Sequence, residues 1–228
     1  MYKNVDFSNE HLLLPEYTPS PFYLIALRVI DIIVSICALI IFSPALILVS
    51  LAILIEDKHN PFYVDMSRLG KDKKRIKFYK FRSMIVNASE MERKNKEIYK
   101  QIRSGVHKIE NHPYVTKVGR FIRKYSIDEM PQFLNVLSGE MSVVGARALK
   151  HDEVEKFLKE EPSYAKYMNA LFEFKPGITG IWQVSGRSKI DFKTRLRMEA
   201  YYNRKRNLLT DILVMLKTPL AVLKAETH

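Results

Sequence analysis

The sequence predicts a fold that is mainly α with a small β element and that carries one N-terminal membrane helix. Residues 32–55 contain no charged residue, and about 20 apolar residues are enough to cross a bilayer as a helix. The chain after this run shows mostly helical spacing, with only two short strand-like stretches. Cys37 is the only cysteine, which excludes an internal disulfide and a cysteine-based zinc site.

The charge of the chain indicates what it binds. A formal net charge of +12 favours an anionic partner, which is nucleic acid, an anionic membrane face or a phosphate-rich substrate. Among 37 lysines and arginines, only Lys3 and Arg28 precede the apolar run. The positive-inside tendency therefore places the part after the run on the cytoplasmic side.

The apolar run has two features that do not suit a simple membrane span. Pro44 follows Ser43 near its middle and should kink a helix, because proline lacks the backbone N–H. Arg28 and Asp31 lie three residues apart just before the run, so they share a helix face and can pair. The helix either crosses straight or bends at Ser43-Pro44 and returns to the same face, and hydropathy alone favours the straight span. A signal peptide does not fit a run that starts this late and is this long.

The rest of the chain divides into short elements. Residues 61–66 and 76–84 are expected to form strands around a turn at residues 68–72. Residues 87 to about 102 form a predicted helix with Asn87 or Ser89 as its cap. Further helices are predicted at residues 151–174, interrupted at Pro162, at 191–203 with Asp191 as a cap, and at 210–223. The last is amphipathic enough to lie on a membrane, although packing on the core suits it equally well.

Two adjacent carboxylates are the candidate catalytic residues. Ser126-Ile127-Asp128-Glu129 has the spacing of a capping box, although Pro131 favours a helix start one or two residues later. Asp128 would then lie near a helix N-terminus, where the dipole should keep it ionised, and an ionised carboxylate can attack phosphorus. Glu129 can hold a magnesium ion. Plain helix capping remains the simpler interpretation of the spacing alone.

Basic residues near this segment in sequence indicate an anionic substrate, although any one of them alone is typical of a solvated surface. They are Lys80, Arg82, Lys117, Arg120, Arg123, Lys124 and Arg147. In residues 174–189, which are rich in glycine, Arg187 could grip a phosphate. The absence of a P-loop and of a Gly-x-Gly-x-x-Gly fingerprint argues against nucleotide hydrolysis and dinucleotide binding.

Several motifs occur in a familiar order. They are Arg28-x-x-Asp31, Ser43-Pro44, Arg68-Leu69-Gly70, Tyr79-Lys80-Phe81-Arg82-Ser83-Met84, Ser126-Ile127-Asp128-Glu129-Met130-Pro131-Gln132, Asn135-Val136-Leu137, Gly139-Glu140-Met141-Ser142, Lys175-Pro176-Gly177-Ile178-Thr179-Gly180 and Gln183-Val184-Ser185-Gly186-Arg187. With them, residues 28–224 resemble the bacterial sugar transferase family, the small monotopic polyprenyl-phosphate phosphoglycosyl transferases that initiate glycan synthesis.

The resemblance implies a two-step reaction. Asp128 would attack the sugar-side phosphorus of a UDP-sugar and release UMP, and polyprenyl phosphate would then take the sugar phosphate from Asp128. Glu129 would ligate Mg²⁺, the implied cofactor. The implied substrate-binding residues are Lys80, Arg82, Arg123, Arg147, Gln183 and Arg187. A direct transfer without a covalent intermediate would use the same residues.

The resemblance also implies an arrangement at the membrane. Residues 22–57 would form a re-entrant membrane helix, with Arg28 and Asp31 as its anchor and Ser43-Pro44 as its break, in place of the straight span. Residues 1–21 would form an N-terminal arm, and residues 58–228 a cytoplasmic α/β catalytic domain with interfacial amphipathic helices. The implied location is the inner membrane of a bacterial cell. The expected partners are the UDP-sugar, polyprenyl phosphate and membrane lipid, with no nucleic acid, and a homodimer stays open.

The sequence departs from the family pattern at three places. Gly145-Ala146-Arg147-Ala148 stands where Gly-Pro-Arg-Pro is usual, Arg206-Asn207 where Trp-Ser is common, and Met66 where a glutamine is common. The acidic pair is intact, so activity is expected. Two alternatives remain from the sequence: a weakly catalytic scaffold of a glycan pathway, and a membrane-anchored binding protein with a basic face.

Overall fold

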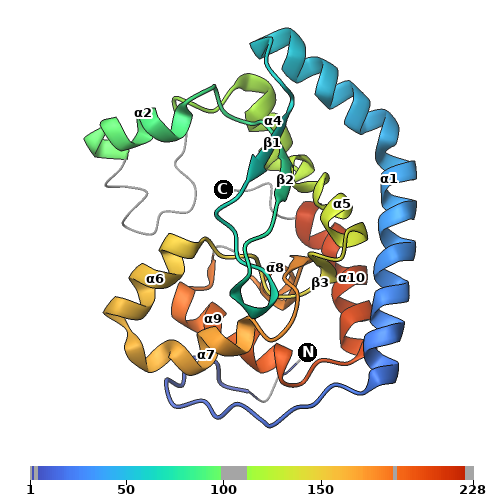
Figure 1. Ribbon diagram of the computed structural model, residues 1–228, viewed down its shortest axis with the longest axis vertical. Coiled ribbons are helices and arrows are strands. Elements are labelled where there is room, and N and C mark those ends of the chain that lie inside the picture. The colour runs from blue at the N-terminus through green and yellow to red at the C-terminus, as the bar shows by residue number, and fades with distance from the viewer. Residues whose placement is uncertain (1, 3–4, 99–111, 187–188, 224–228) are drawn as a thin grey trace.

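The longest element is the N-terminal helix α1 (Pro21–Asp57), which runs along one side of the molecule (Figure 1). The computed structural model describes residue 2 and residues 5–98, 112–186 and 189–223. Ser20 caps α1 by accepting the Tyr23 N–H, Pro21 occupies its first turn, and Lys58 ends it in the left-handed conformation. Among the described residues, α1 is the one helix that is long and apolar enough to cross a membrane.

Helix α1 continues through Ser43-Pro44 as a single helix, and it is bent, as the proline predicted (Figure 1). Pro44 has no N–H for the carbonyl of Ile40, and the Ser43 hydroxyl donates to that carbonyl instead, at 2.8 Å. The backbone group that proline leaves unpaired is therefore satisfied locally. Figure 1 shows the far part of α1 turning toward strand β1 (Phe62–Asp65) and helix α4 (Lys117–Lys124).

Both ends of α1 bind the same domain. Near its start, Asp31 accepts the Val143 N–H at 2.8 Å and the Ser142 hydroxyl at 3.0 Å. At its end, Glu56 accepts the backbone N–H groups of Lys117 at 2.7 Å and Val118 at 3.0 Å. Hydrophobic contacts around buried Ile53 support the second attachment.

The predicted pair of Arg28 with Asp31 does not form, although the two side chains share a helix face as expected. Arg28 donates to the carbonyls of Val136 at 2.6 Å and Leu137 at 2.8 Å. These carbonyls lie at the C-terminal end of a helix, and the Val136 carbonyl also accepts the Gly139 N–H at 3.0 Å; the guanidinium adds a charged donor at this end. Asp31 accepts from the Val143 N–H and the Ser142 hydroxyl, and both side chains thus anchor α1 to the domain.

The two strands predicted from the sequence are confirmed. Strands β1 (Phe62–Asp65) and β2 (Phe78–Phe81) pair antiparallel, with Phe62 opposite Phe81 and Tyr63 opposite Lys80. A second, parallel pair was not predicted: β3 (Ser142–Val144) lies beside β4 (Gly177–Thr179). These strands have only three residues each, too few to show a period in the sequence.

Helices make up most of the remaining structure, which confirms the mainly α prediction. They are α2 (Ala88–Lys94), α4 (Lys117–Lys124), α5 (Gln132–Leu137), α6 (His151–Glu160), α7 (Ala165–Leu171), α8 (Ile181–Ser185), α9 (Phe192–Asn203) and α10 (Leu208–Leu223), with 3₁₀ turns η1 (Lys71–Lys73), η2 (Ile127–Glu129) and η3 (Pro162–Tyr164). The interruption at Pro162 and the Asp191 cap, which accepts the Thr194 N–H at 3.0 Å, are confirmed.

The predicted helix at residues 87–102 is shorter than expected. Asn87 has φ 63° and makes no side-chain cap, and α2 ends at Lys94. The Asn95 side chain accepts the N–H groups of Glu97 and Ile98, both at 3.2 Å, which starts a new turn. Asparagine competes with the helical backbone in this way. Residues 99–102 lie outside the described residues.

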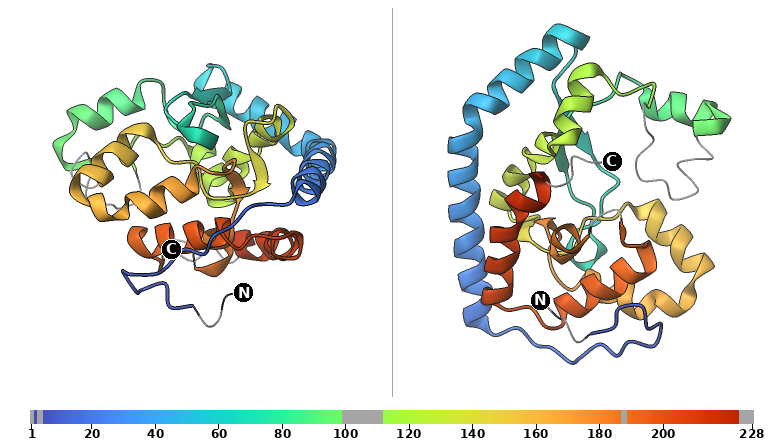
Figure 2. Two further views of the ribbon diagram at one scale, coloured as in Figure 1. Left: turned by 60° about the horizontal axis from the view of Figure 1, so that its bottom comes forward. Right: turned by 180° about the vertical axis from the view of Figure 1, so that it is seen from behind.

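The N-terminal arm packs on the outside of α9 and α10, which lie in one layer (Figure 2). Arg197 of α9 donates to the Phe7 carbonyl at 2.6 Å, and the Tyr167 hydroxyl donates to the Leu12 carbonyl at 2.7 Å. Leu12 and Leu14 contact the largest hydrophobic cluster, under α6, α7 and α9. The arm is irregular, as predicted.

Arg206, which replaces a common tryptophan, lies inside the protein and not on a membrane-facing surface. It is 2% exposed. It donates to the Tyr23 hydroxyl of α1 and to the Val144 carbonyl, and pairs with Asp211 at 3.5 Å. The rings of Tyr23, Phe174 and Tyr202 surround its guanidinium. The buried cation thus joins α1 to α10.

Candidate active site

The acidic pair lies in the 3₁₀ turn η2, between α4 and α5. The predicted capping box is wrong: Ser126 has φ 57° and makes no side-chain cap, and α5 begins at Gln132 after Pro131. The Ser126 carbonyl accepts the Glu129 N–H at 3.3 Å instead. Because Ser126 has the left-handed backbone conformation, the chain turns sharply after α4, and Asp128 and Glu129 lie in a tight turn.

Glu129 is held by one arginine. Arg147 donates to its two carboxylate oxygens, from Nη2 to Oε1 at 2.7 Å and from Nη1 to Oε2 at 3.2 Å. This bidentate pair is one of the strong hydrogen-bonded arrangements. Burial alone would raise the pKa of Glu129, but the Arg147 guanidinium outweighs it and holds that pKa below its usual value. Glu129 therefore stays ionised.

Asp128 has a different electrostatic environment. Burial and the neighbouring Glu129 charge raise the pKa of Asp128 to about 7, against the opposing charges of Lys80, Arg123 and Arg147. The expectation that a helix dipole keeps this residue ionised is wrong, because a single 3₁₀ turn supplies little dipole. In the described part of the chain, the Asp128 carboxylate makes no hydrogen bond or ion pair. A carboxyl group with a pKa near neutrality is typical of a functional site.

Lys80 approaches this pair from β2. Burial lowers the pKa of Lys80, and the charge of Asp128 opposes this effect. The Lys80 ammonium lies 5.3 Å from the centre of the Tyr63 ring, across the strand pair. Two elements far apart in sequence, β2 and η2, thus bring a cation to the acidic pair.

The segment that carries Arg147 is fixed from behind by residues that the sequence analysis did not identify. The Arg147 N–H donates to Glu199 of α9 at 3.0 Å, and Arg195 donates to the same carboxylate at 3.1 Å. The Arg195 guanidinium lies 4.3 Å from the Trp182 ring centre. Arg68 donates to the Ala148 carbonyl at 2.8 Å. One part of this group could have been predicted from the sequence, because Arg195 and Glu199 are four residues apart in a predicted helix and can form an ion pair.

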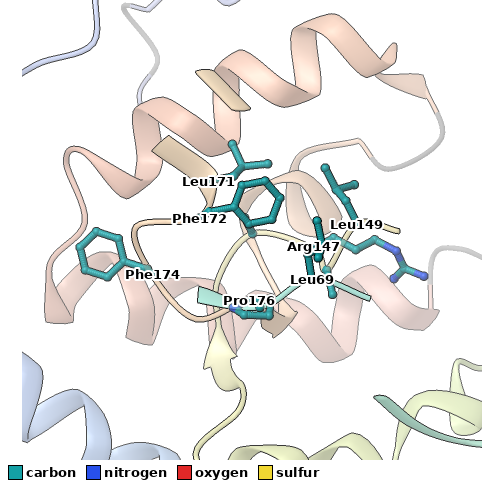
Figure 3. Close-up of a pocket in the computed structure, with 10 residues that line it drawn as sticks. Leu69, Arg147, Leu149, Leu171, Phe172, Phe174 and Pro176 are labelled. Carbon is teal, nitrogen blue, oxygen red and sulfur yellow. The ribbon is translucent and has the colours of Figure 1, made fainter. Parts of the chain in front are cut away.

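A small hollow lies behind the Arg147 segment (Figure 3). Its volume is about 10 Å³, and its lining includes Ala146, Leu171, Phe172 and Pro176. The Arg147 side chain points away from Phe172 and Phe174 in this view. The hollow is too small for a nucleotide sugar.

The other predicted site residues lie apart from this group or outside the description. Arg82 lies 3.9 Å from Asp57 at the end of α1, so its ion pair belongs to the helix attachment. Gln183 is buried, and its amide donates to the Ile178 carbonyl at 3.3 Å, which joins α8 to β4. Both stay predictions as substrate-binding residues. Arg187 lies outside the described residues.

The acidic pair offers donors of the kind that magnesium prefers. Mg²⁺ is usually held by one or two carboxylates together with phosphate oxygens and water. The Asp128 oxygens are free of protein partners in the described part of the chain, and each Glu129 oxygen keeps a lone pair beside its bond to Arg147. No group of three or more His, Cys, Asp or Glu side chains gathers among the described residues. The chain thus supplies few ligands and leaves room for phosphate oxygens.

Comparison with known proteins identifies the family. The bacterial sugar transferase family model matches residues 22–225, so the chain belongs to this family. An uncharacterized sugar transferase of Haemophilus influenzae is 40% identical over 202 residues, which cover 87% of this chain and 41% of that protein. The undecaprenyl-phosphate galactose phosphotransferase of Salmonella typhimurium is 38% identical, over 87% of this chain and 40% of that protein.

A shorter relative matches along most of its own length. The exopolysaccharide production protein ExoY of Rhizobium meliloti is 34% identical over 215 residues, which cover 92% of this chain and 91% of that protein. The chain spans about two fifths of the first two relatives. The family resemblance found in the sequence motifs is thus confirmed.

Proposed function

We propose that this chain is a phosphoglycosyl transferase that moves a sugar 1-phosphate from a UDP-sugar to polyprenyl phosphate, giving polyprenyl-diphospho-sugar and UMP. The product would initiate the synthesis of a surface glycan. One observation carries the proposal: Asp128 has no protein partner in the described part of the chain and lies beside three cations, while its neighbour Glu129 is bound by Arg147. The names of relatives that transfer galactose, glucose and N-acetylgalactosamine phosphates support the reaction class.

In the proposed first step, an Asp128 oxygen attacks the sugar-side phosphorus of the diphosphate. The bond from that phosphorus to the bridging oxygen breaks, and UMP leaves with the electron pair. In the second step, an oxygen of polyprenyl phosphate attacks the same phosphorus, and the Asp128 carboxylate is released. Two steps at one carboxylate let a water-soluble donor and a lipid acceptor use the same site in turn.

The other residues have electrostatic and positioning roles in this proposal. Three cations favour the ionised form of Asp128; they are Lys80, Arg123 and Arg147. They would also stabilise the negative charge on the phosphate oxygens in the transition state. Glu129, held by Arg147, would present oxygens to Mg²⁺ while Asp128 acts as the nucleophile. When bound, the ion would neutralise the diphosphate and make its phosphorus more electrophilic.

We further propose that α1 is embedded in one leaflet of the cytoplasmic membrane and does not cross it. A helix of 37 residues is about 55 Å long, well above the ~30 Å hydrocarbon thickness. If it crossed, Asp31 and Glu56 would lie on opposite sides, yet both bind backbone N–H groups of one domain. The exposed apolar side chains along α1 and α10 support contact with lipid.

The experiment that tests the reaction is UMP release by detergent-solubilised protein with Mg²⁺, undecaprenyl phosphate and a panel of UDP-sugars. Lipid-dependent UMP from one donor, abolished in Asp128→Asn, is the expected result. Asp152→Asn makes the same chemical change at an exposed position of α6 and should keep full activity. A folded protein that releases no UMP from any donor would remove the transferase proposal and favour the scaffold.

A further inference from the structure

A second group of cations lies near the start of α1, away from the acidic pair. Arg28 of α1 and Lys175, just before β4, flank Gly139, with the Lys175 Nζ and the Arg28 Nη2 3.5 and 3.8 Å from the position of a Cβ on that glycine. Lys71 of η1 is close enough for its charge to act on Lys175. Burial and the charges of Arg28 and Lys71 lower the pKa of Lys175. We call Arg28, Lys71 and Lys175 the Gly139 cation cluster.

The positive charge of this cluster is not balanced by an ion pair in the part of the chain that the structure describes. Asp31, whose charge also acts on Lys175, is buried and already accepts hydrogen bonds from Ser142 and Val143. Glu140 accepts the Asn135 amide at 2.8 Å. Lys175 itself makes no hydrogen bond to a described residue. Arg28 already donates to the Val136 and Leu137 carbonyls, and Lys71 is exposed. Lys175 is therefore the half-buried cation of the cluster that lacks a partner among the described residues, and an anion would supply one.

The space between the cations is open because residue 139 is glycine. Its φ of +83° is a conformation that side chains rarely adopt. A methyl group there would occupy the space between Lys175 and Arg28. Residue 139 thus places no side chain beside the two cations, which allows a small anionic group to approach them closely.

The surroundings of the cluster are apolar. On α1, Leu24, Ile25 and Val29 lie within one turn of Arg28, and each is at least 44% exposed. A free phosphate gains nothing from such neighbours, whereas the acyl chains of a lipid can cover them.

The position of the cluster distinguishes two kinds of lipid. Arg28 binds the carbonyls at the C-terminal end of α5, whereas the acidic pair lies before its N-terminal end. Eight residues of mostly helical chain separate Glu129 from Leu137, which is roughly 12 Å at 1.5 Å per residue. A phosphate held at Gly139 is therefore too far from Asp128 to react there, so the occupant is a lipid other than the acceptor.

We propose that the Gly139 cation cluster is a binding site for the headgroup phosphate of an anionic phospholipid, whose acyl chains lie along α1. The bound lipid would fix the depth of α1 in the membrane without taking part in the reaction. The inference rests on the proposed membrane position of α1, and it is independent of the proposed chemistry.

The test is binding of an anionic phospholipid, dioleoylphosphatidylglycerol, to the full chain in a neutral detergent, with no UDP-sugar present. Lys71→Gln with Lys175→Gln removes two charges. The matched control, Lys156→Gln with Lys159→Gln, removes two exposed charges from α6, on the opposite side of the molecule from α1 (Figure 1). A lysine near an anionic membrane surface contributes roughly fivefold in affinity. The cluster variant should therefore bind about 25-fold more weakly, and the control as wild type.

Further variants and a second lipid distinguish the possible outcomes. Lys175→Arg keeps the charge and should keep most of the binding, which separates loss of the cation from loss of folding. Equal losses in the cluster variant and the α6 control, or no loss in either, would overturn the site. A loss confined to undecaprenyl phosphate, with phosphatidylglycerol binding unchanged, would show that the cluster serves the acceptor and would overturn the phospholipid assignment. Because no donor is present, none of these outcomes depends on whether the protein transfers a sugar phosphate.

Discussion

Replacing the proposed nucleophile should make the protein more stable while it abolishes activity. Burial and Glu129 raise the pKa of Asp128 from 3.8 to about 7. An unfolded chain ionises this group more readily than the folded protein does, so its ionisation opposes folding above pH 3.8. Asp128→Asn removes that cost.

The magnitude follows from the shift. Three pKa units correspond to about 4 kcal/mol at 1.36 kcal/mol per unit. Asp128 is only partly buried, and solvent screens its charge, so we expect about half of this value, ~2 kcal/mol. For a chain of this size that is a rise of roughly 4–8 °C in the melting temperature.

The dependence on pH distinguishes this effect from better packing. Well below pH 3.8, Asp128 is protonated in both states, and the variant should melt as wild type does. The difference should grow between pH 4 and 7, where only the unfolded chain releases the proton, and stay constant above pH 7. Thermal melts of both proteins from pH 4 to 8 measure it, with Asp152→Asn as the exposed control. A constant difference at every pH, or a less stable Asp128→Asn at pH 8, would refute the reasoning.

Three further predictions concern the same segment. The value of kcat/KM for UMP release should rise about tenfold per pH unit up to pH 7 and stay constant above it, because only ionised Asp128 attacks. A value of kcat/KM that does not change from pH 5.5 to 8 would contradict the role of Asp128 as nucleophile. Glu199→Ala leaves the backbone N–H of Arg147 and the buried Arg195 without their acceptor, so it should cost about 3–5 kcal/mol in a denaturant titration. Glu199→Gln removes the charge but keeps an acceptor and should cost less; equal losses would contradict a role for the acceptor apart from its charge. The backbone N–H of Ala146 makes no hydrogen bond to a described residue, and Ala146 lines the small hollow. Ala146→Pro should therefore stabilise the protein by about 0.4–1 kcal/mol, because proline restricts the unfolded chain. A destabilised variant would show that the proline ring does not fit.

The sequence identified the central residues but not how they are supported. Asp128, Glu129, Lys80, Arg123 and Arg147 were all named from motifs and charge, and the structure places them where their charges act on one another. Glu199 was not named, because a glutamate in a charged helix is ordinarily a solvated residue. Its role depends on the Arg147 N–H, 52 residues away in sequence, and a contact over that separation leaves no local pattern.

Local patterns failed where the chain turns sharply. Ser126-x-x-Glu129 has the spacing of a capping box, yet the left-handed backbone at Ser126 removes the cap. The same failure occurs at Asn87, which was predicted to cap a helix and instead adopts φ 63°. In both places the spacing is compatible with two backbone conformations, and packing between distant elements selects one of them.

The sequence by itself determined the longer elements and the family to which the chain belongs. Apolar run length, helical spacing and ordered motifs are local properties, and they suffice for α1, for β1 and β2 and for the acidic pair. Only the tertiary structure decided that α1 is one bent helix with both ends on the same domain, that Arg28 and Asp31 bind that domain and not each other, and that Arg206 is buried. The physical reason is that a charged side chain takes the best partner within reach, and the fold decides which groups are within reach.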